Sequence, residues 1–346
     1  MEKARRDIRA LSLDELRHFF TSHSAPAFKG DQVYKWLWSR GTYDFVEMTN
    51  LSKLHRSLLE KYFVINHVAV DKLQRSNDGT IKNAIRLHDG YLVESVLIPT
   101  DTRSTACVSS QVGCSLDCYF CATAKLKRMR NLKPDEIYDQ VVEIDKQSQL
   151  FYNRPLTNIV FMGMGEPLMN YKNTLAAIDK ITSPDGLGMS PKRITVSTSG
   201  ITKIIREISD QNPKFKLAVS LHSAIEETRN RLMPFTKTFP LGQLLDALKY
   251  WYEKTKSQIT FEVVVWKGIN DKQVDIDSLV AYCKQVPSKV NLIEYNSIGD
   301  GQFVQAGREA ISAYTTALKN NKISVTVRRS RGKDIDAACG QLANKK

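Results

Sequence analysis

From about residue 104 onward, short apolar runs alternate with longer amphipathic segments. The runs are TACVSS, NIVFMG, RITVSTS, KLAVSLHS, ITFEVVVW and VNLIEYN, and the amphipathic segments cover about 134–150, 171–183, 201–210, 241–255, 272–285 and 303–320. Strands that alternate with helices predict a parallel sheet with right-handed crossovers. Six such units are too few for a closed eight-fold barrel. We therefore expect an α/β fold built as an open, partial (β/α)6 barrel.

The first hundred residues follow other patterns. Ser12 precedes a turn that contains Asp14 and Glu15, which is typical of a helix N-terminus, and two further amphipathic runs follow. Strand-like runs then flank Asn-Asp-Gly and Asp-Gly turns, which favour hairpins. We expect a small helical accessory domain at residues 1–70, a β-meander connector at 71–100 and the barrel at 101–346.

The compartment follows from apolar content and the start of the chain. The 346 residues are 42% apolar, which suffices for a sizeable core. No apolar run approaches the ~20 residues of a membrane helix, and the first residues lack the apolar core of a signal peptide. We expect a cytoplasmic protein without membrane association. In a reducing cytoplasm, clustered cysteines favour metal binding or catalysis over disulfides.

Positive charge is concentrated near the cysteines. The net charge is +13, and residues 122–134 and 327–333 contain basic residues but no acid. The first run follows a cysteine cluster, and the second leads to Cys339. A generic basic surface is the simpler explanation. The positions favour a polyanionic substrate whose phosphates contact the loop at 125–133.

Three of the six cysteines stand close together, as Cys114-x3-Cys118-x2-Cys121. They fall in the loop after the first barrel strand, where parallel α/β folds carry out their chemistry. A structural zinc site would need four ligands, usually from paired short motifs, and this sequence has no second CxxC. A [4Fe–4S] cluster held by three thiolates keeps one iron open to a further ligand.

This spacing, with Phe120 before the last cysteine, resembles the signature of the radical S-adenosylmethionine (SAM) superfamily. The resemblance implies one [4Fe–4S] cluster on Cys114, Cys118 and Cys121, with the methionine part of SAM on the open iron. One electron from an external donor, which we expect to be flavodoxin-like, would then cleave SAM to a 5′-deoxyadenosyl radical.

Further segments resemble one branch of that superfamily. SSQVGCSLDCYFCAT, FMGMGEPLMN, TVSTSG, SLHS and DIDAACGQL are similar to the adenine C2 methyltransferases of 23S ribosomal RNA and transfer RNA, the RlmN type. The resemblance covers residues 94–342, whereas the accessory domain is similar only in kind. A related branch methylates adenine C8, and Pro167 after GMGE favours C2. A non-catalytic, zinc-bearing RNA-binding module is the alternative from another class.

The resemblance assigns catalytic roles to three residues. Cys339 would receive a methyl group from a first SAM, and the radical made from a second SAM would activate that methyl for addition to C2. The detour is useful because C2 is electrophilic, whereas a thiolate readily attacks the methyl of SAM. Cys107 would release the RNA by forming a disulfide with Cys339, and Glu94 would accept the C2 proton. The structural alternatives are packed thiols and a solvated strand face for Glu94.

The same resemblance assigns the SAM contacts. Gly165 and Glu166 would meet the ammonium group of SAM, since glycine permits close backbone approach, and Met164 would line the radical site. The remaining contacts are Ser197, Ser220, Leu221, His222 and Asn296. His222 has a structural alternative, as a histidine hydrogen-bonded at a strand end. We interpret Cys283 as core packing, and we expect a monomer.

Overall fold

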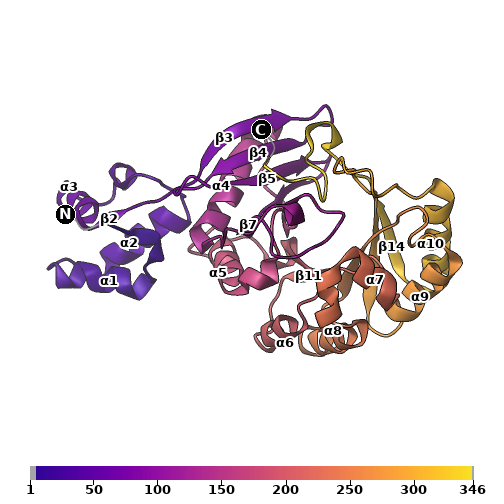
Figure 1. Cartoon of the computed structure of the whole chain (residues 1–346). Coiled ribbons are helices and arrows are strands. Elements are labelled where there is room, and N and C mark those ends of the chain that lie inside the picture. The colour runs from indigo at the N-terminus through magenta and orange to yellow at the C-terminus, as the bar shows by residue number, and fades with distance from the viewer. Residues whose placement is uncertain (1–4, 345–346) are drawn as a thin grey trace.

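The computed structural model describes residues 5–344 and places the expected strands in one curved sheet (Figure 1). Within these residues the sheet has ten strands, in the order β14-β13-β12-β11-β10-β9-β6-β5-β4-β3. The strands are β3 (Ala69–Arg75), β4 (Ile81–Arg86), β5 (Leu92–Pro99), β6 (Ser104–Cys107), β9 (Asn158–Phe161), β10 (Ile194–Thr198), β11 (Lys216–Ser220), β12 (Ile259–Val264), β13 (Ser288–Ile293) and β14 (Ser324–Arg328). Neighbours from β6 to β14 are parallel. The predicted α/β class with an open barrel is confirmed.

Helices follow the parallel strands and lie along the outer side of the arc in Figure 1. They are α4 (Pro134–Tyr152), α5 (Tyr171–Thr182), α6 (Thr202–Asp210), α7 (Glu226–Leu232), α8 (Leu241–Thr255), α9 (Gln273–Cys283) and α10 (Arg308–Asn320). The apolar stripe of α8 is buried as its spacing predicts, with Leu244 and Leu248 inaccessible to solvent. Among residues 5–344, no helix is both long and apolar enough to cross a bilayer.

A helical module precedes the sheet, at the indigo end of Figure 1. It contains α1 (Leu13–Ser22), α2 (Phe28–Trp38) and α3 (Lys53–Tyr62), and β1 (Arg6–Asp7) pairs with β2 (Phe63–Val64). Ser12 and Glu15 form the capping box at α1, as the sequence predicts. Trp38 is buried, so this aromatic side chain belongs to the core.

A buried ion pair fixes the helical module to the barrel. Arg9 lies 2.6 Å from Asp139 and 3.3 Å from Asp135, both on α4. The side chains of Arg9 and Asp139 are 2% and 1% exposed, and the amide of Val68 also donates to Asp139. Such a pair is costly to break because each charge would remain buried without its partner.

The meander β3–β5 continues the barrel sheet, because β5 pairs with β6. Its β3–β4 turn also contacts the segment that leads to Cys339. Asp334 accepts hydrogen bonds from Ser76 and from the Asn77 amide, and Asp78 accepts one from the Gly332 amide. Burial opposes ionisation of Asp78, but hydrogen bonds from Thr80 and Gly332 lower its pKa to about 2. The meander is therefore a platform for the segment that leads to Cys339.

The variant Arg9→Met tests the anchor of the helical module. Loss of the guanidinium leaves Asp139 and Asp135 buried without a cation, so we expect the free energy of unfolding to fall by about 3–5 kcal/mol. Urea unfolding followed by circular dichroism measures this change. Arg5→Met removes an exposed arginine and should change stability by less than about 0.5 kcal/mol. Equal effects of the two substitutions would contradict the assigned anchor.

Candidate active site

An open cavity lies at the carboxyl ends of the parallel strands. Its walls come from residues 113–129 (the cysteine loop), from the loops after β9 to β13, and from the last part of the described chain, residues 337–344 (the C-terminal tail). Loops from successive strands meet here because parallel strands end at one edge of the sheet.

Most of the site residues proposed from sequence meet at this cavity. Cys114, Cys118, Cys121, Gly165, Glu166, Ser197, Ser220, His222, Asn296 and Cys339 line it. Cys107, Glu94, Met164 and Leu221 lie behind its wall: all four are buried, and the sulfur of Met164 accepts a hydrogen bond from the Glu94 amide. The three clustered cysteines and Cys339 thus line the same cavity. The proposed base, Glu94, and the proposed resolving thiol, Cys107, lie behind its wall.

The cysteine loop is closed at its base by a short ribbon. β7 (Gln111–Val112) pairs with β8 (Arg130–Asn131) in antiparallel register. Gly113 has a positive φ of 73°, and a Cβ there would lie 2.4 Å from the carbonyl oxygen of Lys127. Only glycine fits this turn without displacing the opposite strand of the loop.

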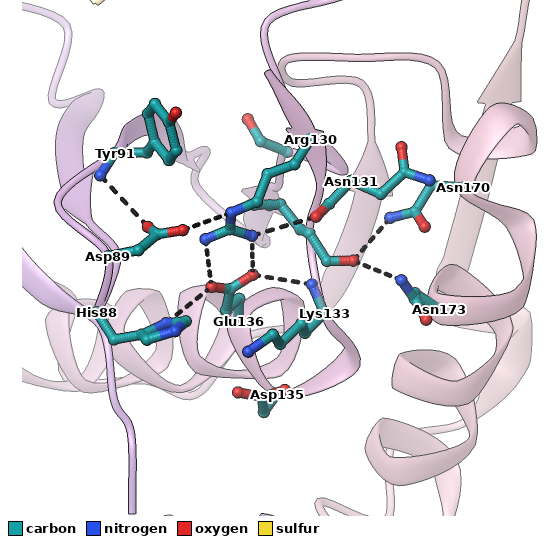
Figure 2. A network of polar contacts seen from close by, with 12 residues as sticks. His88, Asp89, Tyr91, Arg130, Asn131, Lys133, Asp135, Glu136, Asn170 and Asn173 are labelled. Atoms are coloured by element: carbon teal, nitrogen blue, oxygen red, sulfur yellow. Dashed lines mark hydrogen bonds and ion pairs between the residues drawn. The ribbon is translucent and has the colours of Figure 1, made fainter. Parts of the chain in front are cut away.

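The loop is then clamped by Arg130, as Figure 2 shows. Its guanidinium makes two 2.7 Å hydrogen bonds to Glu136 on α4 and one of 2.6 Å to Asp89 in the β4–β5 turn. Glu136 also accepts from the Lys133 amide, and Nδ1 of His88 lies 3.3 Å away. Because bidentate arginine–carboxylate pairs fix geometry as well as charge, Arg130 holds the loop to two separate elements.

Two of the three thiols, Cys114 and Cys118, resist ionisation. Burial raises the pKa of Cys114 to about 11, with a contribution from Cys121. Burial and the charges of its two neighbours raise the pKa of Cys118 further. Within the part of the chain that is described, no three Cys, His, Asp or Glu side chains are placed to hold a single metal ion. The thiolates of a four-iron cluster bind different irons, so this donor set suits a cluster.

A buried polar atom also faces the cavity. Oδ1 of Asn296 has no hydrogen-bond partner among residues 5–344, although Asn296 is 5% exposed. Its amide nitrogen donates to the carbonyl of Cys339 at 3.2 Å. An unsatisfied acceptor in a cavity wall fits a ligand that brings a donor, such as an ammonium group or a hydroxyl.

The GMGE segment after β9 is built around internal contacts. A Cβ on Gly165 would lie 2.5 Å from Cβ of Gln111, and one on Gly163 would lie 2.7 Å from Oγ of Ser109. The glycines therefore permit packing against the β6–β7 segment. Both also line the cavity, so a contact of Gly165 with the ammonium group of SAM stays a prediction. Glu166 accepts from the Ser199 amide and hydroxyl and from the Leu168 amide. Its carboxylate joins the loops after β9 and β10 at the cavity wall.

His222 is held as a neutral side chain. Its Nδ1 accepts a hydrogen bond from the Val264 amide at 3.2 Å, so Nε2 carries the proton. Burial, and then the charge of Arg229, lower its pKa to about 3. Phe120 of the cysteine loop packs edge-on against its ring at 4.7 Å. His222 therefore has the structural role of a histidine hydrogen-bonded at a strand end, and it also lines the cavity.

Cys339 is exposed at the cavity. Burial of its surroundings raises the pKa of this thiol, and the guanidinium of Arg328 opposes the shift. Burial also raises the pKa of Cys107 to about 12, with a further contribution from the charge of Cys339. Both cysteines are free thiols. A disulfide between them therefore stays a prediction.

Glu94 does not lie on a solvated strand face, since it is 2% exposed. Oε1 lies 3.3 Å from Nζ of Lys82 on β4. Oε2 accepts hydrogen bonds from the amides of Ala343 and Asn344, at 2.7 and 3.2 Å. Both oxygens of the proposed base therefore already have partners in this conformation.

Two buried charged residues of the site were missed from sequence. Glu262 interrupts the apolar run of β12, lines the cavity and lies 3.6 Å from Arg328. An acidic residue inside an otherwise apolar strand could have indicated this site residue from the sequence. Arg229 on α7 is 1% exposed and donates to the carbonyls of Ser199, Ser220 and Leu221. No sequence pattern marked it, because its role depends on three carbonyls from two loops.

The basic runs are only partly free to meet a polyanion, and phosphate contact by the loop at 125–133 stays a prediction. Arg130 and Lys125 pair with acids of the chain, and so do Arg328, Arg331 and Lys333 of the second run. Among residues 5–344, the exposed side chains of these runs with no ion pair within 4 Å are Lys127, Arg128, Lys133 and Arg329. Much of the positive charge thus holds loops in place.

The chain is similar to known proteins over its whole length. A model of the radical SAM superfamily matches residues 108–280, and a model of the ribosomal RNA large subunit methyltransferase N-terminal domain matches residues 7–65. A probable dual-specificity RNA methyltransferase RlmN of Flavobacterium psychrophilum is 68% identical over 345 residues, covering 100% of this chain and 99% of that protein. The dual-specificity RNA methyltransferase RlmN of Geotalea uraniireducens is 41% identical over 99% of this chain and 97% of its own length.

A solved structure supports the same relationship. The crystal structure of a radical SAM methyltransferase from Sphaerobacter thermophilus matches with a TM-score of 0.92 and 35% identity, covering 98% of this chain and 100% of that chain. Helical module, meander and barrel therefore occur together in a relative.

The variant Arg130→Met tests the clamp on the cysteine loop. It leaves Glu136 buried without its bidentate partner, so the loop should open more often. We expect a cluster reconstituted in this variant to lose iron to a chelator about tenfold faster than in the unmodified protein. Arg128→Met, in the same loop but exposed, is the matched control for iron loss. Wild-type iron loss from the Arg130 variant would show that the clamp does not hold the cluster loop.

Proposed function

Because the chain belongs to the RlmN family of radical SAM dual-specificity RNA methyltransferases, we propose that it methylates carbon 2 of adenine in two RNAs. The substrates would be adenosine 2503 of 23S ribosomal RNA and adenosine 37 of transfer RNA. The observation that supports this most strongly is the meeting of Cys339 with the three clustered cysteines at one cavity. A zinc-bearing module without catalysis would not need a fourth, separate thiol there, and the family membership rules that alternative out.

The resident cofactors would be one [4Fe–4S] cluster on Cys114, Cys118 and Cys121, and SAM beside it, with two SAM molecules consumed per turnover. When bound, they supply the transferable methyl group and the one-electron chemistry that activates it. Glu166 and Asn296 offer acceptors along the wall for SAM, and Phe120 with His222 offers an apolar edge. Ser197, Ser220 and the backbone of Leu221 complete our assignment of SAM contacts.

Cys339 would be the methyl acceptor. Its sulfur forms a bond to the methyl carbon while the bond from that carbon to the SAM sulfur breaks, so the thiol must first lose its proton. Burial opposes that loss, and the positive charge of Arg328 favours it. Arg328 therefore contributes to making Cys339 a nucleophile, whereas the carboxylate of Glu262, 3.6 Å from Arg328, raises the pKa of the thiol.

Cys107 would release the RNA after the methylene carbon has bonded to adenine. Its thiolate sulfur attacks the sulfur of Cys339, and the bond between the Cys339 sulfur and the methylene carbon breaks. The electron pair stays on that carbon, which takes up a proton and becomes the methyl group. A disulfide results, which an external thiol must reduce before the next cycle. Glu94 would accept the proton that leaves C2. Burial of Cys107 in β6 keeps its thiol protonated until that stage.

RNA and an electron donor would be the partners of the protein. Lys127, Arg128 and Arg329 are exposed and unpaired with acids in the described chain, so they are our candidates for phosphate contacts. The helical module would add RNA contacts of its own. We assign the protein to the cytoplasm as a monomer, with an external one-electron donor of the flavodoxin type.

Two cysteine variants test the assigned roles. Cys107→Ala should accumulate protein linked covalently to RNA, because the adduct forms but is not resolved. Cys339→Ala should lose methylation while it retains iron, because its thiol does not bind the cluster. Denaturing gel electrophoresis with labelled RNA and an iron assay measure the two outcomes. Free, methylated RNA produced by Cys107→Ala at the normal rate would remove Cys107 from the mechanism.

The position of the methyl group tests the regiochemistry. Reconstituted enzyme is incubated with unmethylated 23S ribosomal RNA or transfer RNA, and the nucleosides are then separated and identified by mass spectrometry. We expect 2-methyladenosine from both RNAs. The appearance of 8-methyladenosine would overturn the C2 assignment, and methylation of only one RNA would overturn dual specificity.

A further inference from the structure

The C-terminal tail is held by partners on two sides. On one side the cysteine loop grips it: the Ala122 amide donates to the carbonyl of Gly340 at 2.8 Å, and Oγ1 of Thr123 donates to that of Leu342 at 2.6 Å. On the other side lies the meander, where the carboxylate of Glu94 accepts from the amides of Ala343 and Asn344. Cys339 precedes these contacts directly.

Lys82 completes the meander side of this arrangement. Lys82 and Glu94 stand on adjacent strands, β4 and β5, where Lys82 is two residues from Ala84, the register partner of Glu94. Diagonal neighbours of this kind share one face of a sheet and reach each other. Their side chains are 5% and 3% exposed and lie 3.3 Å apart. A buried lysine without a counter-charge would be strongly unfavourable, so the two side chains depend on each other.

The two oxygens of the Glu94 carboxylate have different partners, which suggests a role for Lys82. Oε1 faces Lys82, which leaves Oε2 directed at the two tail amides. Without Lys82, only the two tail amides would compensate the charge of the buried carboxylate. No group on β4 would then fix the orientation of that carboxylate. The tail would then lose its Glu94 anchor and retain one bond to the meander, from Nδ2 of Asn344 to the carbonyl of Leu92, besides the contacts to the cysteine loop and to the loop after β13.

We propose that Lys82 is a positioning residue for Cys339, acting through Glu94 to seat the C-terminal tail at the cavity. The role of Cys339 as methyl acceptor rests on the function proposed above, whereas the seating of the tail does not. A corollary concerns Glu94. Because Ala343 and Asn344 occupy Oε2, the carboxylate serves as the tail anchor first and becomes available as a base only when these amides leave.

Hydrogen–deuterium exchange of the cluster-loaded protein tests the seating directly. In Lys82→Met, the peptide that covers the tail should exchange about tenfold faster than in the unmodified protein, because the anchor opens more often. Peptides from β9 and β10 should be unchanged. Lys72→Met on β3 removes an exposed lysine and should leave the tail unchanged, and Lys82→Arg, which keeps the charge, should exchange more slowly than Lys82→Met.

Ala343→Pro provides a second variant if Lys82→Met folds poorly. It deletes the amide that donates to Glu94 at 2.7 Å and leaves both partners of the ion pair intact. The tail should again exchange about tenfold faster. Unchanged exchange of the tail in both Lys82→Met and Ala343→Pro would overturn the inference.

Methyl loading separates this inference from the proposed function. Cluster-loaded protein is incubated with SAM that carries a deuterated methyl group, without RNA, and the Cys339 peptide is analysed by mass spectrometry. We expect Lys82→Met to load about tenfold more slowly than Lys72→Met. If the tail of Lys82→Met exchanges fast but Cys339 carries no label in any of the proteins, including the unmodified one, the proposed function is wrong. The seating of the tail by Lys82 would still stand. Normal loading with normal exchange would sink the seating alone.

Discussion

Two hydrogen bonds between the cysteine loop and the C-terminal tail bring the candidate site together. They join Ala122 to Gly340 and Thr123 to Leu342, the second across 219 positions of sequence. Cys121 directly precedes Ala122 in the sequence, and Cys339 directly precedes Gly340. The segment that would hold the cluster therefore also holds the thiol that would take the methyl group. The two segments are therefore joined directly beside the cavity.

The rest of the fold serves this junction by supplying fixed walls. Parallel strands end at one edge, so the loops after β9 to β13 surround the same cavity. Glu166 joins two of these loops, and Arg229 joins two of them through their carbonyls. Arg130 ties the cysteine loop to α4 and to the β4–β5 turn. Charged residues that resemble a nucleic-acid surface in the sequence thus include several that hold the site in shape.

The sequence predicted what depends on local pattern. Strand and helix periodicity gave the open barrel, and the spacing of Cys114, Cys118 and Cys121 indicated a loop for a cluster with one open iron. The resemblance added Cys339, Glu166, His222 and Asn296, which meet at the cavity. Tertiary pairing could not be predicted. Nothing local distinguishes Arg130, which is paired, from Arg128, which is exposed, and the docking of residues 332–344 on the meander depends on contacts across about 250 positions. The close packing of Gly165 against Gln111 could not be predicted for the same reason.

The central claim is that Cys339 carries the methyl group on its way to RNA. The most direct test follows a deuterated methyl from SAM in cluster-loaded protein, first without RNA and then after RNA is added, with mass spectrometry of the Cys339 peptide and of the RNA nucleosides. The account predicts that label appears on Cys339 before RNA is added and is then found in 2-methyladenosine. Labelled 2-methyladenosine formed while Cys339 never carries label would contradict it.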